Sequence, residues 1–183
     1  MDAPRTSSSN PLLIAEIAMQ DAGTIGVTLC PGKKDPDALT GSWDRDLGID
    51  LDAIRHWGAR AVVTLLDDRE LSMLKVTSLG NEVRKRGMAW FQLPIVDTSV
   101  PDDEFERSWH VAGPMIRAIL NGGERVLVHC RGGLGRAGTI AAQILVELGE
   151  EPVAAMRRVR QARPHAIENS AQEAYVRRCR QSN

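Results

Sequence analysis

The sequence predicts an α/β protein with a central, mainly parallel sheet of four to five strands, flanked by helices in a three-layer arrangement. Three observations support this prediction. Short apolar runs alternate with stretches of helical periodicity, a glycine-rich loop joins one apolar run to a helix, and 183 residues with 43% apolar side chains suit one domain. We expect residues 24–183 to form this domain and residues 1–23 to be a flexible tail and lead-in.

Four runs rich in Val, Ile, Leu and Thr are expected to be strands because glycine, proline or aspartate bounds each of them. They are Thr24–Cys30, Ala61–Leu66, Met88–Ile95 and Arg125–His129. Helices are expected at Asp50–Trp57, Ser78–Arg86, Asp103–Leu120, from about Arg136 to Leu148, Pro152–Arg163 and Ala171–Arg180. Pro31–Ser42 is loop-like and is expected to rim a cleft, since ligands of such folds bind at the carboxyl ends of the strands.

Charge and cysteine content narrow the function classes. The net charge of −1 gives no indication of a nucleic-acid partner or a membrane surface, although residues 124–183 carry 10 basic and 6 acidic side chains. Three widely separated cysteines, Cys30, Cys130 and Cys179, suit free thiols in a reducing compartment. With no signal-peptide pattern and no apolar run of membrane-spanning length, we expect a cytoplasmic monomer.

The segment from Val126 to Thr139 is the most informative part of the chain. It runs from an apolar strand through three glycines in five residues into a helix, so backbone N–H groups and a helix N-terminus face the same point. This arrangement predicts a phosphate site. Its residues are Arg131, Gly132, Gly133, Leu134, Gly135 and Arg136.

Cys130 is expected at the floor of this site, where the inward amides and the helix dipole favour the thiolate and make it a nucleophile. Arg136, six positions later, can hold two phosphate oxygens with its planar guanidinium, which a lysine cannot do. His129 precedes the nucleophile at a buried strand end. We therefore expect it to support the loop backbone rather than to transfer protons.

Other uses of a glycine-rich loop fit less well. A Walker-type loop requires a lysine before serine or threonine, and a dinucleotide loop requires the spaced GxGxxG pattern; both are missing here. The four histidines, at positions 56, 110, 129 and 165, are scattered without metal-ligand spacing. We expect no metal and no organic cofactor.

The run His129-Cys-Arg-Gly-Gly-Leu-Gly-Arg136 resembles the HCxxGxxR signature of cysteine-dependent protein tyrosine phosphatases, especially the dual-specificity class. Within that class, Gly26–Gly32 and Leu93–Asp102 resemble the branch of the cyclin-dependent kinase-associated phosphatase. The resemblance implies the phosphatase α/β fold and hydrolysis of a phosphate monoester through a phosphocysteine intermediate.

Such a reaction needs an acid that protonates the leaving oxygen. Asp97 is our choice, because it follows the Met88–Ile95 strand, opens a polar loop and matches the position of the family's general acid. Asp102 is the reserve candidate, although Asp102 and Asp103 are expected to begin a helix.

Two positions bear on turnover. Ala137 stands where the family usually carries serine or threonine, whose hydroxyl helps the thiolate to leave; we therefore expect slow hydrolysis of the intermediate unless Thr139 or a water substitutes. Gln172 lies in a segment that resembles the family's closing segment, where a glutamine can border the pocket. An exposed helix glutamine is the competing interpretation.

The expected function is therefore a tyrosine or dual-specificity phosphatase that acts on a phosphorylated protein or peptide. Two alternatives stay open. One keeps the mechanism but takes a phosphoinositide or nucleotide as substrate, and the other is a phosphoprotein-binding regulator with low turnover. The presence of Cys130, Asp97 and Arg136 together speaks against a pure binder.

Overall fold

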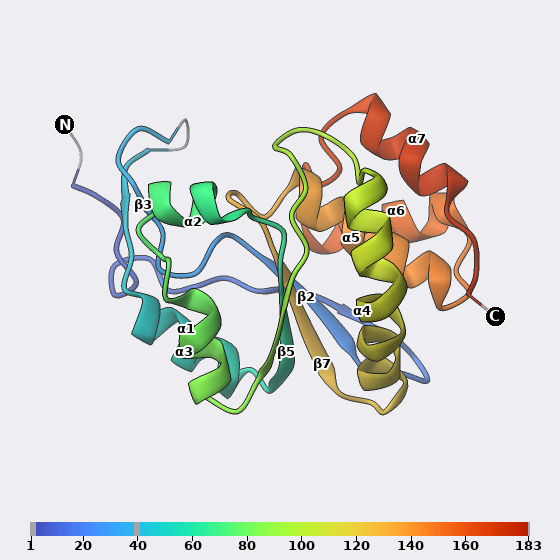
Figure 1. The fold of residues 1–183 in the computed structure, drawn as a ribbon, viewed down its shortest axis with the longest axis horizontal. Helices are drawn as coiled ribbons and strands as arrows, with labels where there is room; N and C mark the ends of the chain where they lie inside the picture. Colours follow the sequence, from blue (N-terminus) through green and yellow to red (C-terminus); the bar gives the residue numbers. More distant parts are fainter. Residues whose placement is uncertain (1–2, 39–40, 183) are drawn as a thin grey trace.

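Five strands lie side by side in the order β1-β2-β7-β5-β6 (Figure 1). The structure is a computed structural model that describes residues 3–38 and 41–182. β1 is antiparallel to β2, and every other neighbouring pair is parallel. The prediction of a mainly parallel sheet is confirmed. The strands are β1 Ala15–Ala18, β2 Thr24–Thr28, β5 Ala59–Thr64, β6 Ala89–Gln92 and β7 Arg125–His129, and a separate pair consists of β3 Lys34–Asp35 and β4 Trp43–Asp44.

Helices cover both faces of the sheet. Figure 1 shows α1 and α3 on one side of the sheet and the helices from α4 to α7 on the other. All six predicted helices are present, with their ends shifted by a few residues. The helices are α1 Leu47–His56, α2 Asp68–Met73, α3 Leu79–Lys85, α4 Asp103–Asn121, α5 Gly135–Glu147, α6 Pro152–Ala162 and α7 Ser170–Arg178. Within the described residues, no helix is long and apolar enough to cross a membrane.

Side-chain caps explain where several helices begin. The Asp102 carboxylate accepts a hydrogen bond from the Phe105 N–H, so Asp102 starts α4 as the sequence predicts. Asp67 caps the short α2 in the same way by accepting from Glu70 N. The sequence did not predict α2, because six residues are too few to show a helical period.

The N-terminal segment differs from the expected flexible lead-in. Ala15–Ala18 form the edge strand β1, and Thr28 Oγ1 donates to the Leu13 carbonyl at 2.7 Å. Arg45 Nη1 donates to the Asn10 carbonyl at 2.8 Å. These polar contacts join the segment to the domain, and neither is visible in the sequence because the partners are distant along the chain.

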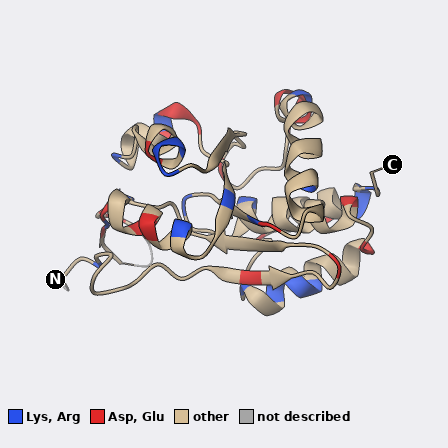
Figure 2. Cartoon of the chain, turned by 90° about the horizontal axis from the view of Figure 1, so that it is seen from below, with Lys and Arg blue, Asp and Glu red and all other residues tan. Residues whose placement is uncertain are grey.

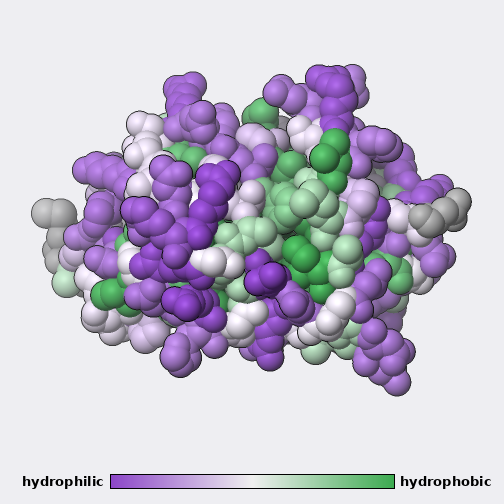
Figure 3. Space-filling view, turned by 60° about the horizontal axis from the view of Figure 1, so that its bottom comes forward, coloured by the Kyte–Doolittle hydropathy of each residue, from purple (hydrophilic) through white to green (hydrophobic). Residues whose placement is uncertain are grey.

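Apolar side chains from the strands and from α5 form the core. Val126, Leu127 and Val128 of β7 are fully buried between the two helical layers. Figure 2 shows the charged residues mainly on helices and loops, with the central strands largely uncharged. On the face seen in Figure 3, apolar side chains gather in one patch within a mostly hydrophilic surface.

The strand register places the predicted loop at one edge of the sheet. His129, the last residue of β7, pairs with Thr28 at the end of β2 and with Thr64 at the end of β5. The carboxyl ends of three parallel strands therefore meet where the loop after His129 begins. This is the edge at which ligands bind in open α/β sheets.

Candidate active site

The loop between β7 and α5 folds around the Cys130 thiol. Cys130 is buried, and the Gly133 N–H points at its Sγ atom across 3.2 Å. Gly133 has a positive φ of 69°, and a Cβ atom there would lie 2.4 Å from the backbone of Thr28. Glycine is therefore required at this position both by conformation and by space.

Arg136 is fixed by three acceptors. Its Nη1 and Nη2 atoms each donate to one carboxylate oxygen of Glu70 at 2.9 Å, and Nη1 also donates to the Ile95 carbonyl at 2.9 Å. Burial alone would lower the pKa of this guanidinium, but the hydrogen bonds to Glu70 and the nearby negative groups outweigh it and raise the pKa. The arginine is therefore charged and preoriented.

Asp97, the predicted general acid, lies beside Arg136. Its Oδ1 atom is 2.9 Å from Arg136 Nη2, and 59% of its side chain is exposed. Both residues line a cavity of about 330 Å³ that has Cys130 among its walls. The reserve candidate Asp102 does not line this cavity, since its carboxylate caps α4.

Four described residues of the Pro31–Ser42 segment line this cavity, as the sequence predicts: Lys33, Asp35, Asp37 and Ala38. Asp35 accepts from Arg131 through both carboxylate oxygens, at 2.8 and 2.9 Å. This pairing compensates the extra positive charge that Arg131 brings to the loop. Lys33 is buried and donates to the Arg131 carbonyl at 3.4 Å, and burial lowers the pKa of its ammonium group although Asp35 opposes this.

His129 is part of a buried hydrogen-bond chain. Its Nδ1 atom lies 3.4 Å from the Cys130 carbonyl, and its Nε2 atom lies 2.8 Å from Thr64 Oγ1. A carbonyl only accepts, so Nδ1 carries the hydrogen and Nε2 accepts from the Thr64 hydroxyl, which itself accepts from Trp90 Nε1. Burial lowers the pKa of His129 to about 4 and keeps the ring neutral.

Residues near the C-terminus also contact the loop between β7 and α5. Arg163 donates to the carbonyls of Gly132 and Gly133 at 3.2 and 3.0 Å. Gln172 is fully buried, so the interpretation as an exposed helix glutamine is wrong. Its Oε1 accepts from Glu168 N at 2.8 Å, and its Nε2 would lie 3.0 Å from a Cβ atom placed at Gly135.

The structure places Cys130, Arg136 and Asp97 in one cavity, leaves Asp102 outside it, and adds residues that the sequence did not nominate. Glu70, Lys33, Asp35 and Glu168 were not predicted, and Arg163 was considered only as one of four arginines, with Arg157, Arg158 and Arg160, that could attract a phosphorylated partner. These residues come from segments far from the loop in sequence. A motif search that reads along the chain has no signal for them, except that Lys33 and Asp35 lie in the segment expected to rim a cleft.

A cysteine held under a glycine-rich loop, with an arginine fixed beside it at the carboxyl edge of this sheet, defines a cysteine-dependent phosphatase. A family profile described as "PTP-SAK: Swiss Army Knife protein, DSP-PTPase phosphatase domain" matches residues 36–176. The chain belongs to this family of dual-specificity phosphatase domains.

Individual proteins agree with this assignment. "Cyclin-dependent kinase inhibitor 3" of Rattus norvegicus is 25% identical over 152 residues, which are 81% of this chain and 68% of the rat protein. The Mus musculus protein of the same name is 27% identical over 126 residues, which are 69% of this chain and 56% of the mouse protein. The resemblance to the kinase-associated phosphatase branch is therefore confirmed.

Solved structures show the same fold. The crystal structure of kinase associated phosphatase (KAP) superimposes with a TM-score of 0.80 at 24% identity and covers 91% of this chain and 93% of that chain. Tk-PTP in the active form superimposes with a TM-score of 0.64 at 28% identity and covers 86% of this chain and 93% of that chain.

Proposed function

We propose that this phosphatase hydrolyses phosphate monoesters through a phosphocysteine intermediate, with Cys130 as nucleophile, Arg136 as phosphate clamp and Asp97 as general acid. The observation that supports this most directly is that all three residues line one cavity, with Asp97 2.9 Å from Arg136. Two distant parts of the chain, the segment after β6 and the loop after β7, thus supply the groups that the chemistry requires.

The first step transfers the phosphoryl group. The Cys130 thiolate attacks phosphorus, a P–S bond forms, the P–O bond to the substrate breaks, and Asp97 gives its proton to the leaving oxygen. The backbone N–H groups of residues 131–135 and the Arg136 guanidinium hold the phosphate oxygens. An arriving phosphate replaces Asp97 as a partner of Arg136, which frees this carboxyl group to face the leaving oxygen.

The second step releases phosphate. Asp97, now deprotonated, removes a proton from water, the water oxygen bonds to phosphorus, and the P–S bond breaks to restore the thiolate. His129 supports the loop through the Cys130 carbonyl, and Gln172 of α7 positions Glu168, which lines the cavity, by accepting from its backbone N–H. Neither metal nor organic cofactor is part of this proposed scheme.

For the substrate we propose a phosphorylated protein or peptide, with phosphotyrosine and also phosphoserine or phosphothreonine as targets. The named relatives and the dual-specificity family support this class of substrate. We also propose a cytoplasmic monomer. All three cysteines are free thiols, and one chain supplies all the proposed catalytic groups.

Release of p-nitrophenol from p-nitrophenyl phosphate, measured without metals across pH, tests the mechanism. Cys130→Ser should abolish turnover, and Asp97→Ala should reduce kcat by about 100-fold or more, because general acid catalysis contributes that much. Asp102→Ala is the matched control and should retain activity if the protein stays folded. Equal activity of Asp97→Ala and the wild type would reject the assignment of the acid.

A low-turnover regulator is the second candidate, and the buried Ala137 after the clamp arginine favours it. In that case phosphate capture is fast and hydrolysis of the phosphoenzyme is slow. A burst of p-nitrophenol equal to the enzyme concentration, followed by slow steady turnover, identifies this behaviour.

A further inference from the structure

A second cavity of about 570 Å³ adjoins the catalytic one. The two cavities share Lys33, Gly132 and Leu134 as lining residues, so the catalytic loop is a common wall. Among the described residues that line the second cavity, four are cations and none is a carboxylate. The cations are Arg5, Lys33, Arg45 and Arg163.

Trp43 lies among three of these cations. The charged groups of Lys33, Arg5 and Arg45 stand 4.9, 5.1 and 5.6 Å from the centroid of its ring. Trp43 and Arg5 are also paired through a backbone bridge between β4 and the N-terminal segment. Cation–π contacts with the indole ring thus hold three positively charged side chains beside the catalytic loop.

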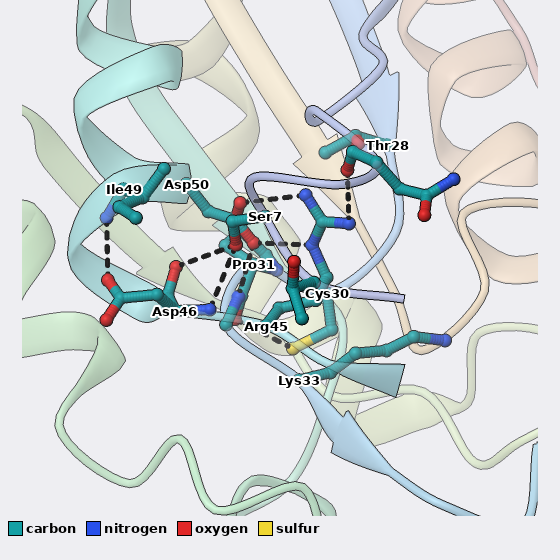
Figure 4. Close-up of polar contacts among 12 residues, drawn as sticks. Ser7, Thr28, Cys30, Pro31, Lys33, Arg45, Asp46, Ile49 and Asp50 are labelled. Atoms are coloured by element: carbon teal, nitrogen blue, oxygen red, sulfur yellow. Dashed lines mark hydrogen bonds and ion pairs between the residues drawn. The ribbon is translucent and has the colours of Figure 1, made fainter. Parts of the chain in front are cut away.

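The four cations differ in how far their charge is already compensated. Arg45 is neutralised by Asp50, since both side chains are 1% exposed and joined by two hydrogen bonds of 2.7 and 2.9 Å. Figure 4 shows this pair pointing toward one another, with the Lys33 ammonium directed away from it. In the described part of the chain, neither Arg5 nor Arg163 forms an ion pair with a carboxylate.

The walls of this cavity are held in place. Ser7 Oγ accepts from Asp46 N at 2.9 Å, which anchors the N-terminal segment to the start of α1. The remaining lining is mainly apolar, from Pro11, Leu12, Leu13, Leu29 and Leu134. Lys33 lies 4.0 Å from Asp35 Oδ2, so the positive charge without a described carboxylate partner is that of Arg5 and Arg163, and it faces an apolar wall.

We propose that this second cavity is a substrate subsite for an anionic side chain, carboxylate or phosphate, next to the phosphorylated residue of a peptide. The inference rests on the proposed function and deepens it. The two cavities share Lys33, Gly132 and Leu134, so an anion in the second cavity would lie next to the catalytic loop, where a residue adjacent to the phosphorylated one in a peptide, with Cα atoms about 3.8 Å apart, can place it. The apolar wall favours a peptide over a sugar phosphate, because the side chains and backbone of a peptide present apolar surface.

Binding of phosphotyrosine peptides to the Cys130→Ser protein, followed by fluorescence anisotropy, tests the subsite without relying on turnover. One series carries glutamate, phosphoserine, alanine or lysine on either side of the phosphotyrosine. At one of the two positions, the acidic peptides should bind about tenfold more tightly than the alanine peptide, which corresponds to one charge-assisted contact. Adding Arg5→Gln should reduce this ratio to below about threefold.

Arg84→Gln is the matched control. Arg84 stacks on Trp90 at 4.8 Å, as Arg5 does on Trp43, but it lines neither cavity. Its removal in the Cys130→Ser background should leave the preference for acidic peptides intact. With Cys130 present, Arg5→Gln should turn over p-nitrophenyl phosphate at the wild-type rate, because this ester carries no second anion.

Three results would overturn the subsite: equal binding of acidic and alanine peptides, an equal loss of preference in Arg84→Gln, or a preference that Arg5→Gln leaves unchanged. A fourth result would point to a non-protein ester as the substrate. In that case the protein binds inositol bisphosphate more tightly than inositol monophosphate, Arg5→Gln removes this difference, and the peptides all bind equally. Failure of the proposed function appears separately, as absence of p-nitrophenyl phosphate turnover in the wild-type protein.

Discussion

Glu70 and Arg136 are 66 residues apart in the chain, yet both carboxylate oxygens of Glu70 accept hydrogen bonds from the Arg136 guanidinium at 2.9 Å. Arg136 is 2% exposed and Glu70 is 20% exposed. The two hydrogen bonds from Glu70 therefore fix the plane in which the guanidinium of Arg136 can meet a phosphate group.

Glu70→Gln should impair catalysis by releasing Arg136 from this orientation. We expect kcat/KM for p-nitrophenyl phosphate to fall by about 100-fold, the effect of a small misplacement of a clamp group. Vanadate binding should weaken in parallel. Glu82→Gln is the control, since Glu82 also accepts from an arginine, Arg86 Nη1 at 2.9 Å, but does not line the cavity. An unchanged kcat/KM in Glu70→Gln would show that the Glu70 carboxylate is not needed to orient Arg136.

Adjacent glycines of the loop should respond differently to a methyl group. At Gly133, alanine is strained by the positive φ and meets the Thr28 backbone, whereas a Cβ atom at Gly132 has no neighbour within 4 Å. Gly133→Ala should lower the free energy of unfolding by about 2 kcal/mol or more and abolish activity. Gly132→Ala should stay within about 0.5 kcal/mol of the wild type. Urea denaturation of both variants checks this, and equal losses would contradict the loop geometry.

Ala137→Ser should accelerate the second chemical step. A hydroxyl next to the loop can stabilise the departing thiolate, and Thr139 has no free hydrogen to offer because its Oγ1 donates to the Gly135 carbonyl at 2.7 Å. Stopped-flow kinetics should show a burst in the wild type and a smaller burst with a higher kcat in Ala137→Ser. Thr139→Val, as control, should leave the burst unchanged. If neither variant alters it, dephosphorylation does not depend on a hydroxyl here.

Acid should destabilise the protein through His129. Its pKa is about 4 in the folded chain and 6.5 as the ordinary value, so between these pH values the unfolded chain binds a proton that the folded chain does not. Stability due to this group is complete above pH 6.5 and falls by about 3 kcal/mol as the pH drops to 4. Denaturation curves at pH 7 and pH 4.5 measure the slope, and His129→Gln should be less sensitive. The same slope in both proteins would contradict the burial argument.

The sequence predicted those features whose cause is local. The glycine-rich loop, Cys130 and Arg136 lie within seven consecutive residues, and strand and helix periods framed them correctly. Asp97 was placed by its position after β6, and the structure brings it to Arg136. The role of Glu70 as a partner of Arg136 was not predicted, because nothing in the sequence distinguishes an acidic residue in a short polar helix from an ordinary surface glutamate. Only the tertiary arrangement of α2 against the loop distinguishes it.

The same reason explains the N-terminal segment. A polar, serine-rich stretch has the composition of a disordered tail. Its order comes from partners elsewhere, such as the Arg45 side chain that donates to the Asn10 carbonyl. Part of the environment of Gln172 is equally non-local, since its Nε2 donates to the carbonyl of Ser99, 73 residues away.

The two carbonyl contacts of Arg163 also affect the order in which the protein matures during synthesis. The ribosome delivers Cys130 and Arg136 more than twenty residues before Arg163, which follows α6. A nascent chain that ends at α5 contains Cys130 and Arg136. It lacks Arg163, which donates hydrogen bonds to the carbonyls of Gly132 and Gly133. A fully ordered phosphate loop therefore requires that α6 and Arg163 have also been synthesised.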